Sequence, residues 1–207
     1  MNIDRNYICE NVFTITLGTD RVRDNELTQL ESLKVDGTDY ISLFAVDFPE
    51  ETGDARHISL INKGLLETVG MSKDELGFFA AVNVKKNLVM LPVNDAIREL
   101  NPFADYEFKE DLFTVVTNKK KCFGAGILAF GSVGFNYISD QLKLNKFFVV
   151  PSSIHEVLVL PYVDYISPEY ILGLVKAINA NGVRPEDRLT DNVYIYDRET
   201  DQFSACF

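Results

Sequence analysis

The sequence predicts an α+β fold in which a mixed, largely antiparallel sheet, or more than one sheet, packs against about four to five helices. Three observations support this prediction. Segments that alternate apolar and polar residues are interspersed with segments of helical period. Several neighbouring strand segments are joined by connections of hairpin length, which require antiparallel pairing. Capping signals mark the starts of two of the helices.

Strand-like patterns recur along the whole chain. They cover residues 12–17, 40–46, 57–61, 112–116, 125–130, 147–150, 157–160, 193–196 and 202–207. The six residues 151–156 and the five residues 197–201 are short enough to close hairpins between the strands that flank them.

Helical patterns lie between these strands. The helices expected are 24–33, one that starts after Ser72 and runs to about Lys85, 95–100, 132–144 and one that starts at Ser167-Pro168. Ser72 and Glu75 have the spacing of a capping box, and a serine followed by proline is a strong helix start. A strand, a serine-capped helix and an asparagine occur around Ile58 and again around Val157, which is a weak internal repeat that coincidence could also produce.

The composition is that of an ordinary globular protein. Of 207 residues, 46% are hydrophobic and 25% are charged, which excludes a disordered tail, a collagen-like fibre and a coiled-coil rod. We expect one α+β domain over residues 1–207, and a division into two sub-lobes, 1–100 and 101–207, stays open. The oligomeric state is not indicated by the sequence.

Several site classes and compartments are disfavoured. No apolar run is long enough to span a membrane, and we expect no signal peptide at the N-terminus. Three scattered cysteines (Cys9, Cys122 and Cys206) do not form a disulfide framework, and two histidines without a Cys-x-x-Cys motif do not form a zinc site. We therefore expect a cytoplasmic protein with reduced thiols, with no metal and no cofactor.

The chain is acidic, with a formal net charge of −11. The excess of acids lies in residues 1–60 and 151–207, on either side of a nearly neutral middle. Such a surface repels phosphate backbones, so direct nucleic-acid binding is not expected, whereas a protein partner with a basic surface is. The candidate residues for an acidic binding surface are Asp36, Asp39, Asp47, Glu50, Glu51 and Asp54.

The most suggestive residues for catalysis are His155 and Glu156, with Ser152 and Ser153 close by in the sequence. A histidine beside a carboxylate can carry out acid–base chemistry, and a nearby serine can act as a nucleophile. The same residues are also typical of a turn in which serine hydroxyls and the imidazole bond backbone groups. Neighbours in a regular strand point to opposite faces, which argues against His155 and Glu156 acting together there.

Three further motifs have structural interpretations beside the functional ones. Cys122 follows Lys119–Lys121 and could pair with His155 as a thiol–imidazole dyad, although it also opens an apolar run that is typical of core. Gly124 and Gly126 lack the P-loop pattern, so close backbone packing is favoured over phosphate binding. The three lysines are typical of a solvated turn.

The C-terminal part of the chain resembles a known family. The residues that carry the resemblance are Thr117-Asn118, Gly124-Ala125, the string Val150-Pro151-Ser152-Ser153-Ile154-His155-Glu156-Val157, Asn179 at a helix end, and Leu189-Thr190-Asp191-Asn192-Val193-Tyr194-Ile195-Tyr196-Asp197. Together with the segment from Ile58 to Asn83 they resemble domain of unknown function 5688 over roughly residues 40–200. The resemblance implies a bacterial protein, common in clostridial gut anaerobes and often carried on mobile elements, and it implies no catalytic residue.

Two classes of function are therefore expected. The first is a non-enzymatic acidic binding protein that acts by protein–protein contact, as a mobile-element accessory or a counter-defence inhibitor of the anti-CRISPR or anti-restriction type. The alternative is a small hydrolase or transferase centred on His155 and Glu156 with Ser152 or Ser153.

Overall fold

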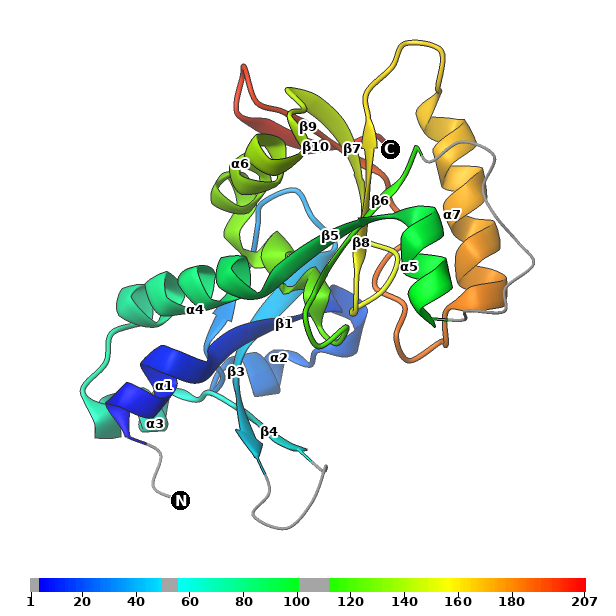
Figure 1. Ribbon diagram of the computed structural model, residues 1–207. Helices are drawn as coiled ribbons and strands as arrows, with labels where there is room; N and C mark the ends of the chain where they lie inside the picture. The colour runs from blue at the N-terminus through cyan, green and yellow to red at the C-terminus, as the bar shows by residue number, and fades with distance from the viewer. Residues whose placement is uncertain (1–3, 50–55, 101–111) are drawn as a thin grey trace.

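The computed structural model describes residues 4–49, 56–100 and 112–207, and it contains two antiparallel sheets with helices packed around them (Figure 1). The predicted α+β class is confirmed, because every strand pairing within the described residues is antiparallel. No helix in these three ranges is long and apolar enough to cross a membrane.

The first sheet is built around its longest strand, which is the third in sequence order. Its strands are β1 (Val12–Gly18), β2 (Ser32–Leu33), β3 (Tyr40–Pro49) and β4 (Arg56–Leu60). Strand β3 pairs with all three others, and its residues 40–46, which are apolar apart from Ser42, are buried, as expected for a central strand. Three helices pack against this sheet around Phe44 and Leu76: α1 (Arg5–Asn11), α3 (Lys63–Val69) and α4 (Lys73–Asn87).

The second sheet has the strand order β10-β9-β7-β8-β6-β5. Its strands are β5 (Leu88–Pro92), β6 (Thr114–Asn118), β7 (Lys146–Val150), β8 (Val157–Pro161), β9 (Tyr194–Asp197) and β10 (Gln202–Ala205). The two hairpins predicted around residues 151–156 and 197–201 are confirmed, because β7 pairs with β8 and β9 pairs with β10.

Helices cover both faces of the second sheet. One face packs against the 3-10 helix η2 (Gly124–Phe130) and against α6 (Gly131–Leu142), with Phe147 and Val149 directed toward them. The other face packs against α5 (Val93–Leu100) and α7 (Pro168–Gly182), with Phe148 and Val150 directed there. Alternate residues of β7 thus enter different cores, which explains why this strand is apolar at every buried position.

The predicted helix starts are confirmed in detail. The hydroxyl of Ser72 accepts a hydrogen bond from the backbone N–H of Glu75, whose carboxylate accepts one from the N–H of Ser72. The pKa of Glu75 is lowered, first by that backbone hydrogen bond and then by Arg5. Ser167 caps α7 in the same way, with proline in its first turn.

Two predicted elements are wrong. Residues 125–130 form the 3-10 helix η2 and not a strand, because the segment lies between the two sheets and is buried on every side. The helix expected over 24–33 is only α2 (Asp24–Leu27), after the short 3-10 helix η1 (Thr19–Arg21), and residues 32–33 instead pair with β3 as β2.

Buried hydroxyl groups join η2 to the first sheet. The hydroxyl of Thr14 donates to the carbonyl of Gly126 at 2.8 Å, and that of Thr16 donates to the carbonyl of Ala125 at 3.2 Å. Gly124 and Gly126 both allow a close approach of the neighbouring backbone, as predicted from the sequence. A Cβ on Gly126 would lie 2.4 Å from the carbonyl oxygen of Thr14.

A carboxylate at the start of β3 forms the second junction between the sheets. We call Asp39, Thr190, Asn192 and Tyr194 the Asp39 cluster. The Asp39 carboxylate accepts hydrogen bonds from the Thr190 and Tyr194 hydroxyls, and from the side-chain amide of Asn192 at 2.8 Å. Burial, followed by the bond to Asp39, raises the pKa of Tyr194. The segment that supplies these donors is part of the string that resembles the family.

Candidate functional site

The connection between β7 and β8 contains the candidate catalytic residues. It is held against residues 187–190: the N–H of Ile154 donates to the carbonyl of Asp187, and the N–H of Leu189 donates to the carbonyl of Ser152. Ser152 and Ser153 are both 2% exposed, and Ile154 is 7% exposed. Residues 152–154 therefore form a buried connection that is hydrogen-bonded to residues 187–189.

His155 bonds protein groups through both ring nitrogens. Its Nδ1 accepts the backbone N–H of Phe123 at 3.2 Å, which leaves the ring proton on Nε2. That nitrogen lies 3.3 Å from one carboxylate oxygen of Asp187, and Arg184 bonds the other oxygen at 2.7 Å. The imidazole has neither nitrogen free for acid–base chemistry in this arrangement.

The backbone of His155 reinforces this structural role. Its carbonyl accepts the hydroxyl of Thr117 at 2.8 Å and the N–H of Gly124 at 2.9 Å. Phe123 has φ +58°, a left-handed conformation that costs a bulky residue about 1–2 kcal/mol. The bond from its N–H to the imidazole, and the ring contact at 5.7 Å between centroids, help to hold that conformation.

The serines and Glu156 do not share one role. The hydroxyl of Ser153 accepts the backbone N–H of His155 at 2.9 Å, a local turn bond. Ser152 and Glu156, in contrast, line a cavity of about 440 Å³ that His155 does not line. The structure thus brings Ser152 and Glu156 together and directs the imidazole to Phe123 and Asp187.

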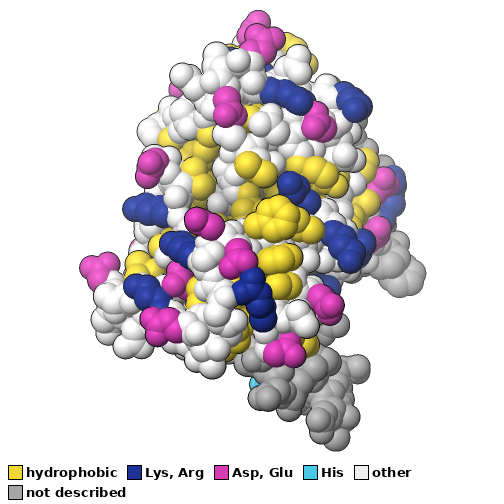
Figure 2. All heavy atoms as spheres, turned by 90° about the vertical axis from the view of Figure 1, so that its left-hand side faces the viewer, with side chains coloured by type: hydrophobic (Ala, Val, Ile, Leu, Met, Phe, Trp, Pro, Cys, Tyr) yellow, Lys and Arg dark blue, Asp and Glu magenta, His cyan; other side chains and the backbone are white. Residues whose placement is uncertain are grey.

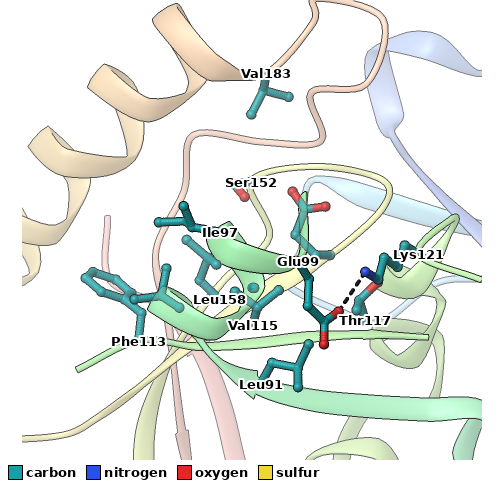
Figure 3. A pocket seen from close by; sticks show the side chains of 13 residues that line it. Leu91, Ile97, Glu99, Phe113, Val115, Thr117, Lys121, Ser152, Leu158 and Val183 are labelled. Carbon is teal, nitrogen blue, oxygen red and sulfur yellow. Dashed lines mark ion pairs between the residues drawn. The ribbon is translucent and has the colours of Figure 1, made fainter. Parts of the chain in front are cut away.

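We call this cavity the α5 pocket, after the helix that forms one of its walls (Figure 3). Its apolar walls come from β5, α5, β6 and β8, and they include Leu91, Val93, Ile97, Phe113, Val115 and Leu158. Its polar groups are Thr117, Ser152, Glu156 and an ion pair of 2.6 Å between Glu99 and Lys121. An apolar cavity with a few polar groups at one side is typical of a site for a small ligand.

The three candidate residues of the acidic surface that the structure describes have different surroundings. Asp36 is exposed, Asp39 belongs to the Asp39 cluster, and Asp47 forms an ion pair of 2.6 Å with Lys120. Glu50, Glu51 and Asp54 lie outside the described residues. Of the three acids that are described, only Asp36 presents an exposed carboxylate.

Cys122 and the three lysines before it, Lys119–Lys121, do not form a catalytic pair with His155. Lys119 donates to the carbonyl of Lys86, and Lys120 and Lys121 form the ion pairs with Asp47 and Glu99. Cys122 is half-buried, and both ring nitrogens of His155 have the other partners given above. No group of three or more His, Cys, Asp or Glu side chains within the described residues has the geometry to hold a metal ion.

The structure also has an exposed aromatic surface that was not predicted from the sequence. Tyr165 is 81% exposed, Tyr170 is 62% exposed, and Tyr162 is 36% exposed. All three belong to the β8–α7 connection and the first turn of α7, where Asp164 and Glu169 are exposed beside them. We call these five residues the aromatic surface.

A second exposed patch lies on α4. Phe78 is 64% exposed and Val82 is 43% exposed, one turn apart on the helix. Figure 2 shows the face that carries this helix, where hydrophobic side chains gather among lysines and arginines. Unlike the aromatic surface, this α4 patch has no carboxylate between its exposed apolar residues.

We expect His155→Ala to lower the free energy of unfolding by about 1–3 kcal/mol, because it leaves the Phe123 N–H without its acceptor and leaves Arg184 as the remaining partner of the Asp187 carboxylate. Urea unfolding of the purified variant measures this change. Glu67→Ala, at an exposed position of α3, is the control, with an expected change within about 0.5 kcal/mol. Unchanged stability of His155→Ala together with loss of a defined function would contradict the structural role.

Comparisons with known proteins give one match. Residues 39–198 match the model of a family described as a family of unknown function (DUF5688). No curated protein matches the chain, and no solved structure does.

Proposed function

The chain belongs to the DUF5688 family, a family of unknown function, and we propose that it is a non-catalytic, acidic binding protein that acts by contact with a basic protein surface. The observation that carries the proposal is the aromatic surface, in which exposed tyrosine rings alternate with exposed carboxylates. Exposed aromatic side chains in such numbers are uncommon on monomeric surfaces and enriched at interfaces.

One ring of this surface already binds a cation within the molecule. The ammonium of Lys146 lies 4.6 Å from the ring centroid of Tyr162, which packs on Phe148 behind it. Tyr165 and Tyr170 are more exposed than Tyr162, and each follows a carboxylate in the sequence. A lysine or arginine from a partner could therefore contact a ring and a carboxylate together, which is how cations are held at aromatic sites.

The overall charge supports the same kind of partner. A net charge of −11 attracts a basic surface and accelerates its association, and the effect weakens as salt screens it. The biological setting we propose is that of a mobile-element accessory or counter-defence inhibitor, whose targets would be nucleic-acid-handling proteins with basic channels. This setting rests on the family resemblance and on the charge.

The alternative proposal is a small hydrolase or transferase. Ser152 and Glu156 share the α5 pocket, which favours it, whereas the engagement of both His155 nitrogens removes the imidazole as a base for the serine. Turnover of an ester or phosphoester substrate that Ser152→Ala abolishes would support this alternative over the binding function.

Affinity purification from the native host tests the binding function. The tagged wild-type protein is compared with Tyr165→Ser/Tyr170→Ser, and with Phe78→Ser/Val82→Ser on the α4 patch as the matched control. We expect the wild type and the control to recover the same stoichiometric basic partner, and the tyrosine variant to recover at least about tenfold less. Equal recovery by all three proteins, or no partner, would contradict the proposal.

A second measurement separates charge from ring contact. With the purified partner, Asp164→Asn/Glu169→Gln is expected to weaken binding at low salt more than at high salt, because screening already reduces the contribution of these carboxylates at high salt. An unchanged salt dependence would show that the two carboxylates do not face the partner.

A further inference from the structure

We propose that the α5 pocket binds a small primary amine with an aliphatic body, held by Glu156 and Ser152 at its head and by the apolar wall along its chain. This inference does not depend on the proposed protein–protein contact, because the pocket and the aromatic surface have no residue in common.

The size and the walls of the pocket fit a small ligand. Its volume of about 440 Å³ lies within the range of small-molecule sites. The walls carry Leu91, Val93 and Val115 on adjacent elements, and Figure 3 shows Ile97, Phe113 and Leu158 gathered at one side of the cavity. An aliphatic chain placed there would bury its surface against side chains that already lack water on their other faces.

Two polar groups of the pocket have no hydrogen-bond partner in the part of the chain that the structure describes. The hydroxyl of Ser152, a residue only 2% exposed, has no hydrogen-bond partner among the residues that the structure describes, and it lines the pocket. The Glu156 carboxylate lines the same pocket, also without a partner within the described ranges. A carboxylate only accepts hydrogen bonds, and a hydroxyl can accept one as well. The head group that satisfies both is a donor, and an ammonium supplies three donors.

The local charge favours a cation. Glu99 also lines the pocket, but Lys121 neutralises it at 2.6 Å. Among the charged side chains that line the pocket, Glu156 is the one that has no counterion within the described residues. A carboxylate or phosphate ligand would meet this negative charge in a cavity of low polarity, where like charges repel strongly. A neutral alcohol would fill the apolar part and leave the charge unpaired.

The test uses n-hexylamine, with n-hexanol and hexanoate as probes of the same length. Calorimetric titration and the thermal midpoint are measured on the full chain near neutral pH, where a primary alkyl amine is protonated. We expect hexylamine to bind and to raise the midpoint, hexanol to bind more weakly, and hexanoate to bind weakest of the three.

Glu156→Gln is the decisive variant, because it removes the charge and keeps the shape of the side chain. Its affinity for hexylamine is expected to fall about tenfold or more, while its affinity for hexanol stays the same. Glu67→Gln, at an exposed acid of α3, is the matched control and should bind all three probes as the wild type does. Ser152→Ala is expected to weaken hexylamine binding less than Glu156→Gln does.

Three outcomes would overturn the proposal: no binding of hexylamine, equal affinity for hexylamine in the wild type and Glu156→Gln, or hexanoate as the tightest probe. The Tyr165→Ser/Tyr170→Ser protein should bind hexylamine as the wild type does. Amine binding in the α5 pocket can therefore be confirmed even if the basic partner is never found. The failure of the partner proposal and the failure of the amine proposal are thus distinguishable.

Discussion

Gly126→Ala is expected to destabilise the protein by about 3 kcal/mol or more, or to prevent its folding, because the new methyl group has no space. Its Cβ would lie 2.4 Å from the carbonyl oxygen of Thr14 and 2.8 Å from the hydroxyl of the same residue. Neither atom can move freely. The carbonyl belongs to strand β1, and the hydroxyl donates to the carbonyl of Gly126 itself. The substitution must therefore push η2 away from the first sheet.

Urea unfolding of Gly126→Ala beside Gly173→Ala measures this effect against a matched control. Gly173 lies within α7, and a Cβ there would have no atom within 4 Å. Alanine has the higher helix propensity, so Gly173→Ala should stabilise the protein by about 0.5–1 kcal/mol. A wild-type midpoint for Gly126→Ala would mean that η2 and β1 do not approach as closely as described.

Gly124 gives an independent test of the same principle. A Cβ at this position would lie 2.4 Å from the carbonyl oxygen of His155 and 2.6 Å from the Cα of Thr117. The two glycines flank Ala125 in a string that carries part of the family resemblance. Their requirement is thus explained by backbone packing, without a phosphate or any other ligand.

The sequence predicts much of the fold because many elements carry local signals. Strands that alternate in polarity, such as β1, are recognisable from a period of two, and short connections identify hairpins such as β7–β8. The capping box at Ser72 fixes the start of α4 for a chemical reason that needs no tertiary information. Such local signals can be recognised from the sequence alone.

The elements that were missed or misassigned depend on tertiary context. The segment 125–130 is apolar throughout, and such a run does not distinguish a strand from a buried helical turn. Strand β5 follows α4 directly, with no glycine or proline between them, so no breaker marks the change from helix to strand. In α3, by contrast, Asn62 at the N-cap and Gly70 at the C-cap were signals that could have been used.

Only part of the candidate site could be predicted from the sequence, for a related reason. Sequence proximity identified Ser152, His155 and Glu156 together, but it could not show that the imidazole turns to Phe123 while Ser152 and Glu156 face a cavity. The pocket walls come from β5, α5, β6 and β8, which are brought together only by the strand order of the second sheet. The aromatic surface did have a signal, since Tyr170 lies off the stripe of Ile171 and Val175 that α7 buries.

Asp39→Asn is expected to lower the free energy of unfolding by about 2–3 kcal/mol, because a carboxylate that accepts three hydrogen bonds becomes an amide that accepts at one oxygen. Thr190 and Asn192 both donate to one carboxylate oxygen, and Tyr194 donates to the other. With the amide oxygen toward Thr190 and Asn192, the NH₂ group faces the Tyr194 hydroxyl, which must turn from donor to acceptor. The charge-assisted bonds of the carboxylate are then replaced by weaker neutral ones.

Chemical unfolding of Asp39→Asn beside Asp36→Asn isolates the contribution of the cluster. Both substitutions remove one negative charge from the same segment, but Asp36 is exposed, so its variant should change stability by less than about 0.5 kcal/mol. A double-mutant cycle with Tyr194→Phe should give a non-additive result, since both variants remove the same hydrogen bond. Equal stability of the two asparagine variants would contradict the role of the cluster.

The Asp39 cluster also bears on how the family resemblance should be interpreted. It joins the start of β3 in the first sheet to the start of β9 in the second, through donors from residues 190–194. If Asp39→Asn loosens that junction, amide hydrogens of both sheets should exchange faster, whereas an effect confined to one sheet would indicate a local turn bond. A loss of protection in both sheets would mean that the string at 189–197 holds the sheets together, and that ligand-binding roles belong to the α5 pocket and the aromatic surface instead.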